Sequence, residues 1–92
     1  MDVSTSCWKD FFCNWPKGMA PTGVLVTTFG EQVPFSSFMT GKTLLMMERK
    51  TPDSLGCRML LVAYEEITAL KIVDVVDSKI FLSLGFDVAP SK

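Results

Sequence analysis

Histidine is absent from this chain of 92 residues, and cysteine is scarce. Without histidine, a Ser-His-Asp catalytic triad is excluded. The three cysteines, Cys7, Cys13 and Cys57, are odd in number and show no Cys-x-x-Cys spacing. We therefore expect neither a structural metal site nor a disulfide framework, but three reduced thiols packed as small apolar groups. No motif for a bound cofactor is present.

Net charge and long apolar runs are lacking as well. Nine Lys and Arg residues oppose ten Asp and Glu residues, so no overall positive field draws the chain to nucleic acid or to an anionic membrane. No apolar stretch approaches the roughly 20 residues of a membrane span. The first residues also lack the basic and apolar regions of a secretory signal. These features predict a cytoplasmic protein without a membrane partner.

Apolar side chains, in contrast, make up 48% of the sequence. A chain of this length forms one small domain with a limited core, so we expect a single domain over residues 1–92. The apolar excess predicts either a dense core or an apolar surface that a second chain covers. The second case favours a homo-oligomer.

An amphipathic helix is predicted over residues 5–15. Its aromatic residues have the spacing i, i+3, i+4 and i+7 and are Trp8, Phe11, Phe12 and Trp15. Thr5 or Ser6 can cap the start of the helix, and Pro16 ends it. We expect the aromatic stripe to close one end of a sheet.

Strand-like segments follow, separated by turn residues; they are 22–29, 32–38, 43–49, 58–64 and 67–76. Pro34 predicts that the second strand is an edge or bends. In the fifth strand, alternation places Ile67 and Ala69 on one face and Leu70 on the other. Residues 77–85 predict a short helix, capped by Asp77, and residues 86–92 form a tail.

The predicted fold class is mostly β with an N-terminal α-helix and a short C-terminal helix. The strands over residues 22–76 would form a small, strongly bent, five-stranded antiparallel barrel, because closure removes the exposed edges of an open sheet. The very short break at Tyr64-Glu65-Glu66 predicts a sharp corner between the fourth and fifth strands.

This arrangement resembles the Sm-like barrel family, in which a helix precedes five bent strands. In that family almost no loop separates the fourth strand from the fifth. The segment that carries the resemblance is Leu60-Leu61-Val62-Ala63-Tyr64-Glu65-Glu66-Ile67-Thr68-Ala69-Leu70-Lys71-Ile72-Val73. The resemblance implies assembly into rings through edge strands and binding of RNA. Residues 35–39 read Phe-Ser-Ser-Phe-Met in place of a base-contacting Asp-x-x-x-Asn loop, so the resemblance assigns no nucleotide-contacting residue. The chain as a whole also resembles a family of short bacterial proteins, which implies no function.

Basic residues gather in the turn between the third and fourth strands. Arg49, Lys50 and Arg58 are the candidate site for an anion or for nucleic acid, because arginine offers paired donors to phosphate. The alternative is a solvated hairpin tip in which Asp53 pairs with Arg58.

The third and fourth strands are apolar on both faces, which predicts cover on both sides. The candidate interface residues there are Met46, Met47, Met59 and Leu61. No catalytic residue is assigned, since the adjacent carboxylates Glu65 and Glu66 point to opposite sides of a strand. The sequence therefore predicts a non-enzymatic module that self-associates through barrel edge strands; the alternative is an RNA-binding ring of Sm-like type.

Overall fold

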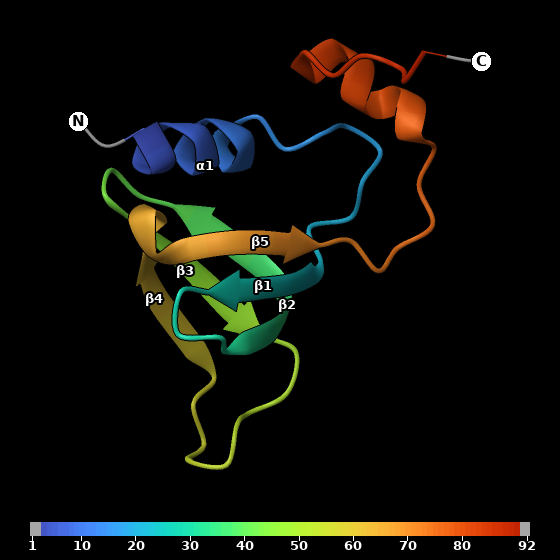
Figure 1. Ribbon diagram of the computed structural model, residues 1–92. Helices are drawn as coiled ribbons and strands as arrows, with labels where there is room; N and C mark the ends of the chain where they lie inside the picture. Colours follow the sequence, from blue (N-terminus) through green and yellow to red (C-terminus); the bar gives the residue numbers. More distant parts are fainter. Residues whose placement is uncertain (1–2, 91–92) are drawn as a thin grey trace.

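The computed structural model describes residues 3–90, which form one helix, a five-stranded antiparallel sheet and two 3₁₀ helices (Figure 1). Their bounds, in chain order, are α1 Val3–Cys13, β1 Gly23–Thr27, β2 Gln32–Thr40, β3 Leu44–Arg49, β4 Met59–Ala63, η1 Tyr64–Glu66, β5 Ile67–Lys71 and η2 Ser78–Leu84. The strands lie in the order β4-β3-β2-β1-β5. The predicted helix and all five predicted strands are thus confirmed in their order.

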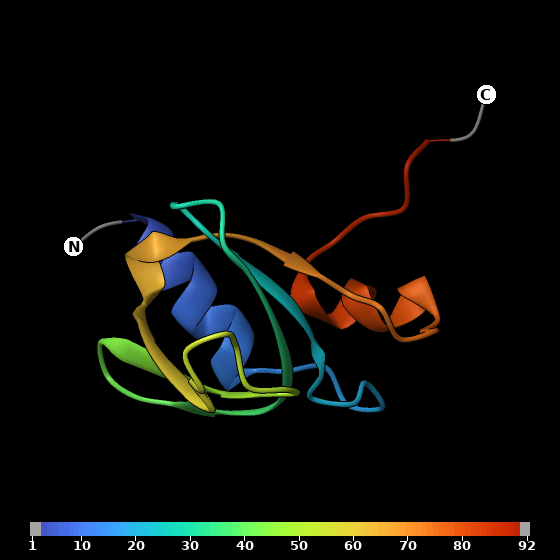
Figure 2. The same ribbon diagram turned by 90° about the horizontal axis from the view of Figure 1, so that it is seen from below.

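The sheet curves strongly, and β2 is the strand that bends most visibly (Figure 2). The register between β2 and β3 shifts between Phe35 and Ser37, which marks an irregularity in the ladder at this bend. One half of β2 pairs with β1 and the other half with β3. The bend therefore lets one long strand belong to both halves of the sheet.

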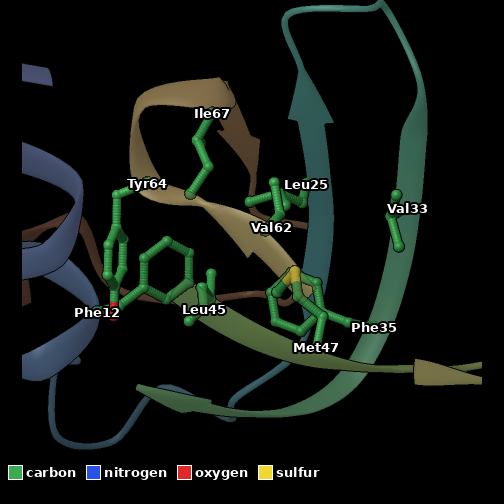
Figure 3. Packing of buried hydrophobic residues seen from close by; sticks show 9 residues of the cluster. All are labelled: Phe12, Leu25, Val33, Phe35, Leu45, Met47, Val62, Tyr64 and Ile67. Carbon is green, nitrogen blue, oxygen red and sulfur yellow. The ribbon is translucent and has the colours of Figure 1, made fainter. Parts of the chain in front are cut away.

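The core lies on the concave face of this curved sheet, under α1 (Figure 3). Phe12 of α1 and Tyr64 of η1 point into the space that the strands enclose. The other buried members of the cluster come from all five strands and are Leu25, Val33, Phe35, Leu45, Met47, Val62 and Ile67. The helix is therefore an integral part of the core, as the aromatic stripe predicted.

The remaining aromatic side chains of the stripe are half-buried around Phe12. The Phe12 ring meets Phe38 edge-on, with ring centroids 5.1 Å apart. Trp15 lies just after the end of α1, and its indole N–H donates to the Met19 carbonyl at 2.9 Å. The helix begins at Val3, so the predicted capping residues Thr5 and Ser6 lie inside it and do not cap it.

The predicted closure into a barrel is not present. β4 and β5 are the two outer strands of the sheet and do not pair with each other. The short helix η1 joins them as the predicted sharp corner, and from there the two strands diverge. The sheet therefore keeps the two edges that closure would have removed.

Of the two alternatives predicted from Pro34, the edge strand is wrong, since β2 lies between β1 and β3, whereas the bend is present, because the register with β3 shifts between Phe35 and Ser37. The missing N–H of Pro34 is tolerated because this residue lies where β3 has ended, and its carbonyl accepts from the Lys50 N–H at 3.0 Å.

The fifth strand ends at Lys71, five residues before the predicted end at residue 76. Lys71 pairs with Val24, close to the start of β1 at Gly23. The chain before β1 turns away, with the Thr22 N–H donating to the Ala20 carbonyl at 2.7 Å. Residues after Lys71 consequently have no strand to pair with, and they lead to η2 beyond the end of β5.

Candidate interaction surface

Apolar side chains gather on the convex face of the sheet, over β2, β3 and β4. We call this surface the outer patch; its members are the exposed Met39, Leu44, Met59 and Leu61 and the half-buried Met46. Met39 pairs with Met46 across β2 and β3, and Met46 pairs with Leu61 across β3 and β4. These three residues form a row across the sheet, and both Met39 and Leu61 are 65% exposed.

The outer patch exists because β3 and β4 are apolar at every position of their pairing except Glu48. Side chains alternate between the two faces of a strand, so Leu45 and Met47 enter the core while Leu44 and Met46 face outward. An apolar surface of adaptable methionines at the outside of a small domain is typical of a contact with another protein.

The structure separates the four candidate interface residues. Met46, Met59 and Leu61 lie on the convex face, whereas Met47 is fully buried in the core of this chain. Sequence reasoning left Met39 and Leu44 out of this set. The strand register identifies these two residues as members of the outer patch, because it aligns Met39 with Met46 and Leu44 with Ala63.

The turn between β3 and β4 is organised by Asp53. Its carboxylate oxygen Oδ1 accepts from the N–H of Cys57 at 2.8 Å and from the N–H of Leu55 at 2.9 Å. The hydrogen bond from Cys57 is the main reason why the pKa of Asp53 is held below its usual value; burial opposes this, and the Leu55 N–H and the charge of Arg49 add to it. Asp53 therefore bonds to the backbone of its own turn, and no bond joins it to Arg58 within residues 3–90.

The structure brings Arg49 and Arg58 together. Arg49 is the last residue of β3, and Arg58, which directly precedes β4, lies opposite it. The Arg49 N–H donates to the Arg58 carbonyl at 2.7 Å. The guanidinium of Arg49 lies 3.9 Å from Glu31 Oε2 and also donates to the Thr51 carbonyl at 3.1 Å, so it is already engaged by its own chain. Of the three candidate anion-binding residues, Lys50 and Arg58 are the exposed ones.

Tyr64 is the most deeply buried polar side chain of the core. Its hydroxyl donates to the Gly41 carbonyl at 2.9 Å. Burial is the main reason why the pKa of Tyr64 is raised above its usual value, and the nearby Cys13 adds to the effect. The hydroxyl holds the corner η1 against the turn between β2 and β3, which is a structural task.

A depression of about 660 Å³ lies between the end of α1 and η2. Its lining includes Cys13, Lys17 and Ser83, with no carboxylate among the lining residues. The carboxylate of Glu66 lies elsewhere, where it accepts from the Thr28 hydroxyl. Within residues 3–90, no group of three or more His, Cys, Asp or Glu side chains is placed to hold a metal ion.

The part of the chain that the structure describes contains no helix long and apolar enough to cross a membrane. The three cysteines are free thiols, with Cys7 and Cys13 exposed on α1.

Comparison with protein families, with curated proteins and with solved structures finds no match to this chain. The outer patch and the two open edges of the sheet are the features of the described residues that a second chain could cover.

Proposed function

We propose that this chain is a non-enzymatic interaction and assembly module of the cytoplasm, which self-associates through the edge strands of its sheet and the outer patch. The observation that carries the proposal is that the outer patch extends to an unpaired edge, since Met59 and Leu61 belong to the outermost strand β4. Backbone groups of an edge strand and apolar side chains beside them are the two surfaces that a second chain can cover at once.

The hydrogen bonds of Asp53 and Tyr64 have a structural explanation. Asp53 and Tyr64 both bond to backbone groups of nearby turns, so their perturbed pKa values follow from the fold and need no reaction to explain them. Free thiols are typical of proteins in a reducing compartment, which supports the cytoplasmic location in this proposal.

The proposal is tested by the mass of the purified protein in solution. Size-exclusion chromatography with light scattering at micromolar concentration should give a multiple of the chain mass of 10.2 kDa. Met59→Ser should lower the average mass, because it removes an apolar contact from the outer patch. Phe29→Ser is the matched control, since Phe29 is more exposed than Met59 but lies in the turn between β1 and β2. A strictly monomeric parent protein would overturn the proposal.

The second candidate function is an RNA-binding ring of Sm-like type. It is favoured by the helix, the five strands and the short corner η1, which are the features on which the resemblance rests. The exposed Lys50 and Arg58 would be the phosphate contacts. Binding to single-stranded RNA should then weaken with rising salt and with Arg58→Ala. Absence of binding at low salt would reject this candidate.

A further inference from the structure

The free edge of β4 presents a defined set of backbone groups. The hydrogen bond from the Arg49 N–H to the Arg58 carbonyl shows that this pair is a hydrogen-bonded pair of the β3–β4 ladder. Such pairs alternate along an antiparallel ladder, so Leu60 and Val62 also direct their N–H and C=O groups towards β3. The groups of Met59, Leu61 and Ala63 therefore point away from the sheet.

The edge at β5 is different because it is protected against pairing. The register between β1 and β5 shifts at Val26/Thr27, which makes this edge irregular. Thr68 donates its hydroxyl to the Val26 carbonyl at 3.1 Å, and Lys71 ends the strand with a charge. Bulges and lysines are the devices that keep an edge strand from pairing with another chain.

The strand β4 has neither a bulge nor a lysine, and among its outward groups the Met59 carbonyl accepts, within residues 3–90, only from the thiol of Cys57, at 3.1 Å. Its register with β3 is continuous from Met59 to Ala63, and its sequence Met-Leu-Leu-Val-Ala contains neither proline nor charge. A regular, apolar and unprotected edge next to the outer patch is the place where the sheet can be extended.

We propose that two copies of this chain pair antiparallel through β4 about a two-fold axis at Leu61, which joins their sheets into one. This proposal rests on the proposed self-association and specifies its geometry. The register that uses every outward backbone group of β4 places Leu61 opposite Leu61 of the partner subunit and Met59 opposite the partner's Ala63. A closed two-fold dimer of this kind is the commonest symmetric assembly.

The faces of the two sheets match in this arrangement. Residues opposite each other in an antiparallel pair have their side chains on the same face. Leu61 lies on the convex face, so the row formed by Met39, Met46 and Leu61 continues into the same row of the second copy. The two outer patches thereby become one apolar stripe.

The charges at the two ends of β4 are complementary in the same register. Arg58 precedes β4 and Glu65 follows it, and both side chains are exposed. In this register Arg58 lies opposite the partner's Tyr64 and next to the partner's Glu65, and the symmetry repeats this arrangement at the other end of the strand. Opposite charges at the rim of an interface favour this orientation over others.

A disulfide at the proposed axis tests the register directly. Leu61→Cys is prepared in a chain whose native cysteines Cys7, Cys13 and Cys57 are replaced by serine. The Cα atoms of a hydrogen-bonded antiparallel pair lie about 5.5 Å apart, which is within the range of a disulfide. Mild oxidation should therefore convert most of this variant to a covalent dimer. Met39→Cys in the same background is the control, since Met39 is equally exposed on the convex face but lies in β2.

Each outcome decides the proposal. A covalent dimer of Leu61→Cys together with monomeric Met39→Cys supports it. If the parent protein associates but Leu61→Cys forms no more dimer than Met39→Cys, pairing through β4 is wrong while self-association stands. A parent protein that is monomeric in light scattering overturns both proposals.

Charge reversal gives an independent readout of the orientation. Arg58→Glu should weaken the dimer severalfold, because it places like charges beside the partner's Glu65. Combining it with Glu65→Arg should restore dimerisation, since both members of each contact are then reversed. Lys50→Glu, with the same change of charge, should leave the dissociation constant unchanged. A double variant that associates no better than Arg58→Glu would contradict the antiparallel register.

Discussion

The hydroxyl of Tyr64 donates a 2.9 Å hydrogen bond to the carbonyl of Gly41 and so ties the corner between β4 and β5 to the turn between β2 and β3. These two residues are 23 positions apart in the sequence. Tyr64 belongs to the same buried cluster as Phe12, so the bond fixes this corner beside the helix that covers the concave face.

Tyr64→Phe should lower the free energy of unfolding by about 0.5–1.5 kcal/mol, the usual net contribution of one hydrogen bond. The pKa of Tyr64 is raised mainly by burial, so the folded state favours the neutral phenol. The stability due to this group is full below the usual value of 10.0 and is lost as pH rises through the higher pKa of the folded state. Denaturant unfolding at neutral and alkaline pH measures both effects.

The control for this prediction is the phenylalanine variant itself, which has no phenol to titrate. Tyr64 is the single tyrosine of the chain, so the ultraviolet absorbance of tyrosinate reports its titration directly. A tyrosinate signal in the folded protein at or below pH 10 would contradict the raised pKa.

Phe12→Ala should destabilise the protein by roughly 3–5 kcal/mol, because it leaves a cavity in the core. Phe12 is only 2% exposed and meets Phe38 edge-on. Cys13→Ala is the neighbouring control, since Cys13 is exposed and its truncation should change stability by less than about 0.5 kcal/mol. Thermal and denaturant unfolding give both values.

Removal of the whole helix should have a larger effect of the same kind. A chain that begins at Pro16 should aggregate or unfold at a much lower temperature than the parent protein, since the concave face of the sheet would lose its cover. A truncated chain that stays soluble and unfolds cooperatively near the parent melting temperature would mean that the aromatic stripe serves a partner.

Much of this fold is readable from the sequence, because its elements have clear periods and clear breaks. The spacing of Trp8, Phe11 and Phe12 predicts the helix and its buried face, and glycines with positive φ mark the turns after β1 and after η2. Asp77 caps η2 as predicted, with Oδ1 accepting from the Lys79 N–H at 3.0 Å.

Three properties of the sheet could not be predicted from the sequence: which face of each strand is buried, how neighbouring strands are aligned, and whether the sheet closes into a barrel. β3 and β4 are apolar on both faces, so alternation alone does not tell that Met47 is buried while Met46 faces outward. The shift near Thr27 breaks the simple alternation of β5, and Leu70 packs against the core together with Ile67 although the sequence places them on opposite faces. The open sheet depends on how β4 and β5 diverge after η1, which is a property of tertiary packing.

Asp53→Ala should loosen the turn between β3 and β4, because the N–H groups of Leu55 and Cys57 lose their common acceptor. Amide hydrogen exchange at these two residues should become faster, while exchange in β1 stays unchanged. Asp53→Asn should have a milder effect, since an amide oxygen can still accept. Asp87→Ala, in the exposed segment after η2, is the control for loss of a carboxylate.

The same carboxylate gives an acid dependence. The pKa of Asp53 is held below its usual value of 3.8, chiefly by the Cys57 N–H. Its contribution to stability is therefore full above that value and is lost as pH falls through the lower pKa of the folded state. Protection from exchange at Leu55 and Cys57, relative to the intrinsic exchange rate at each pH, should fall in this acid range in the parent protein but not in Asp53→Ala. Equal acid dependence in both proteins would contradict the assignment.

Thr27→Val should stabilise the protein by about 1 kcal/mol. The side chain of Thr27 is 4% exposed, and its hydroxyl oxygen has no hydrogen-bond partner within residues 3–90. A buried hydroxyl without a partner loses its bonds to water and gains none, whereas a valine methyl fills the same space without that cost. Thr28→Val is the matched control at the next position, since the Thr28 hydroxyl donates to Glu66 and its loss should not stabilise the protein. Urea unfolding compares the three proteins. A Thr27→Val variant less stable than the parent would show that the hydroxyl bonds to an internal water in solution.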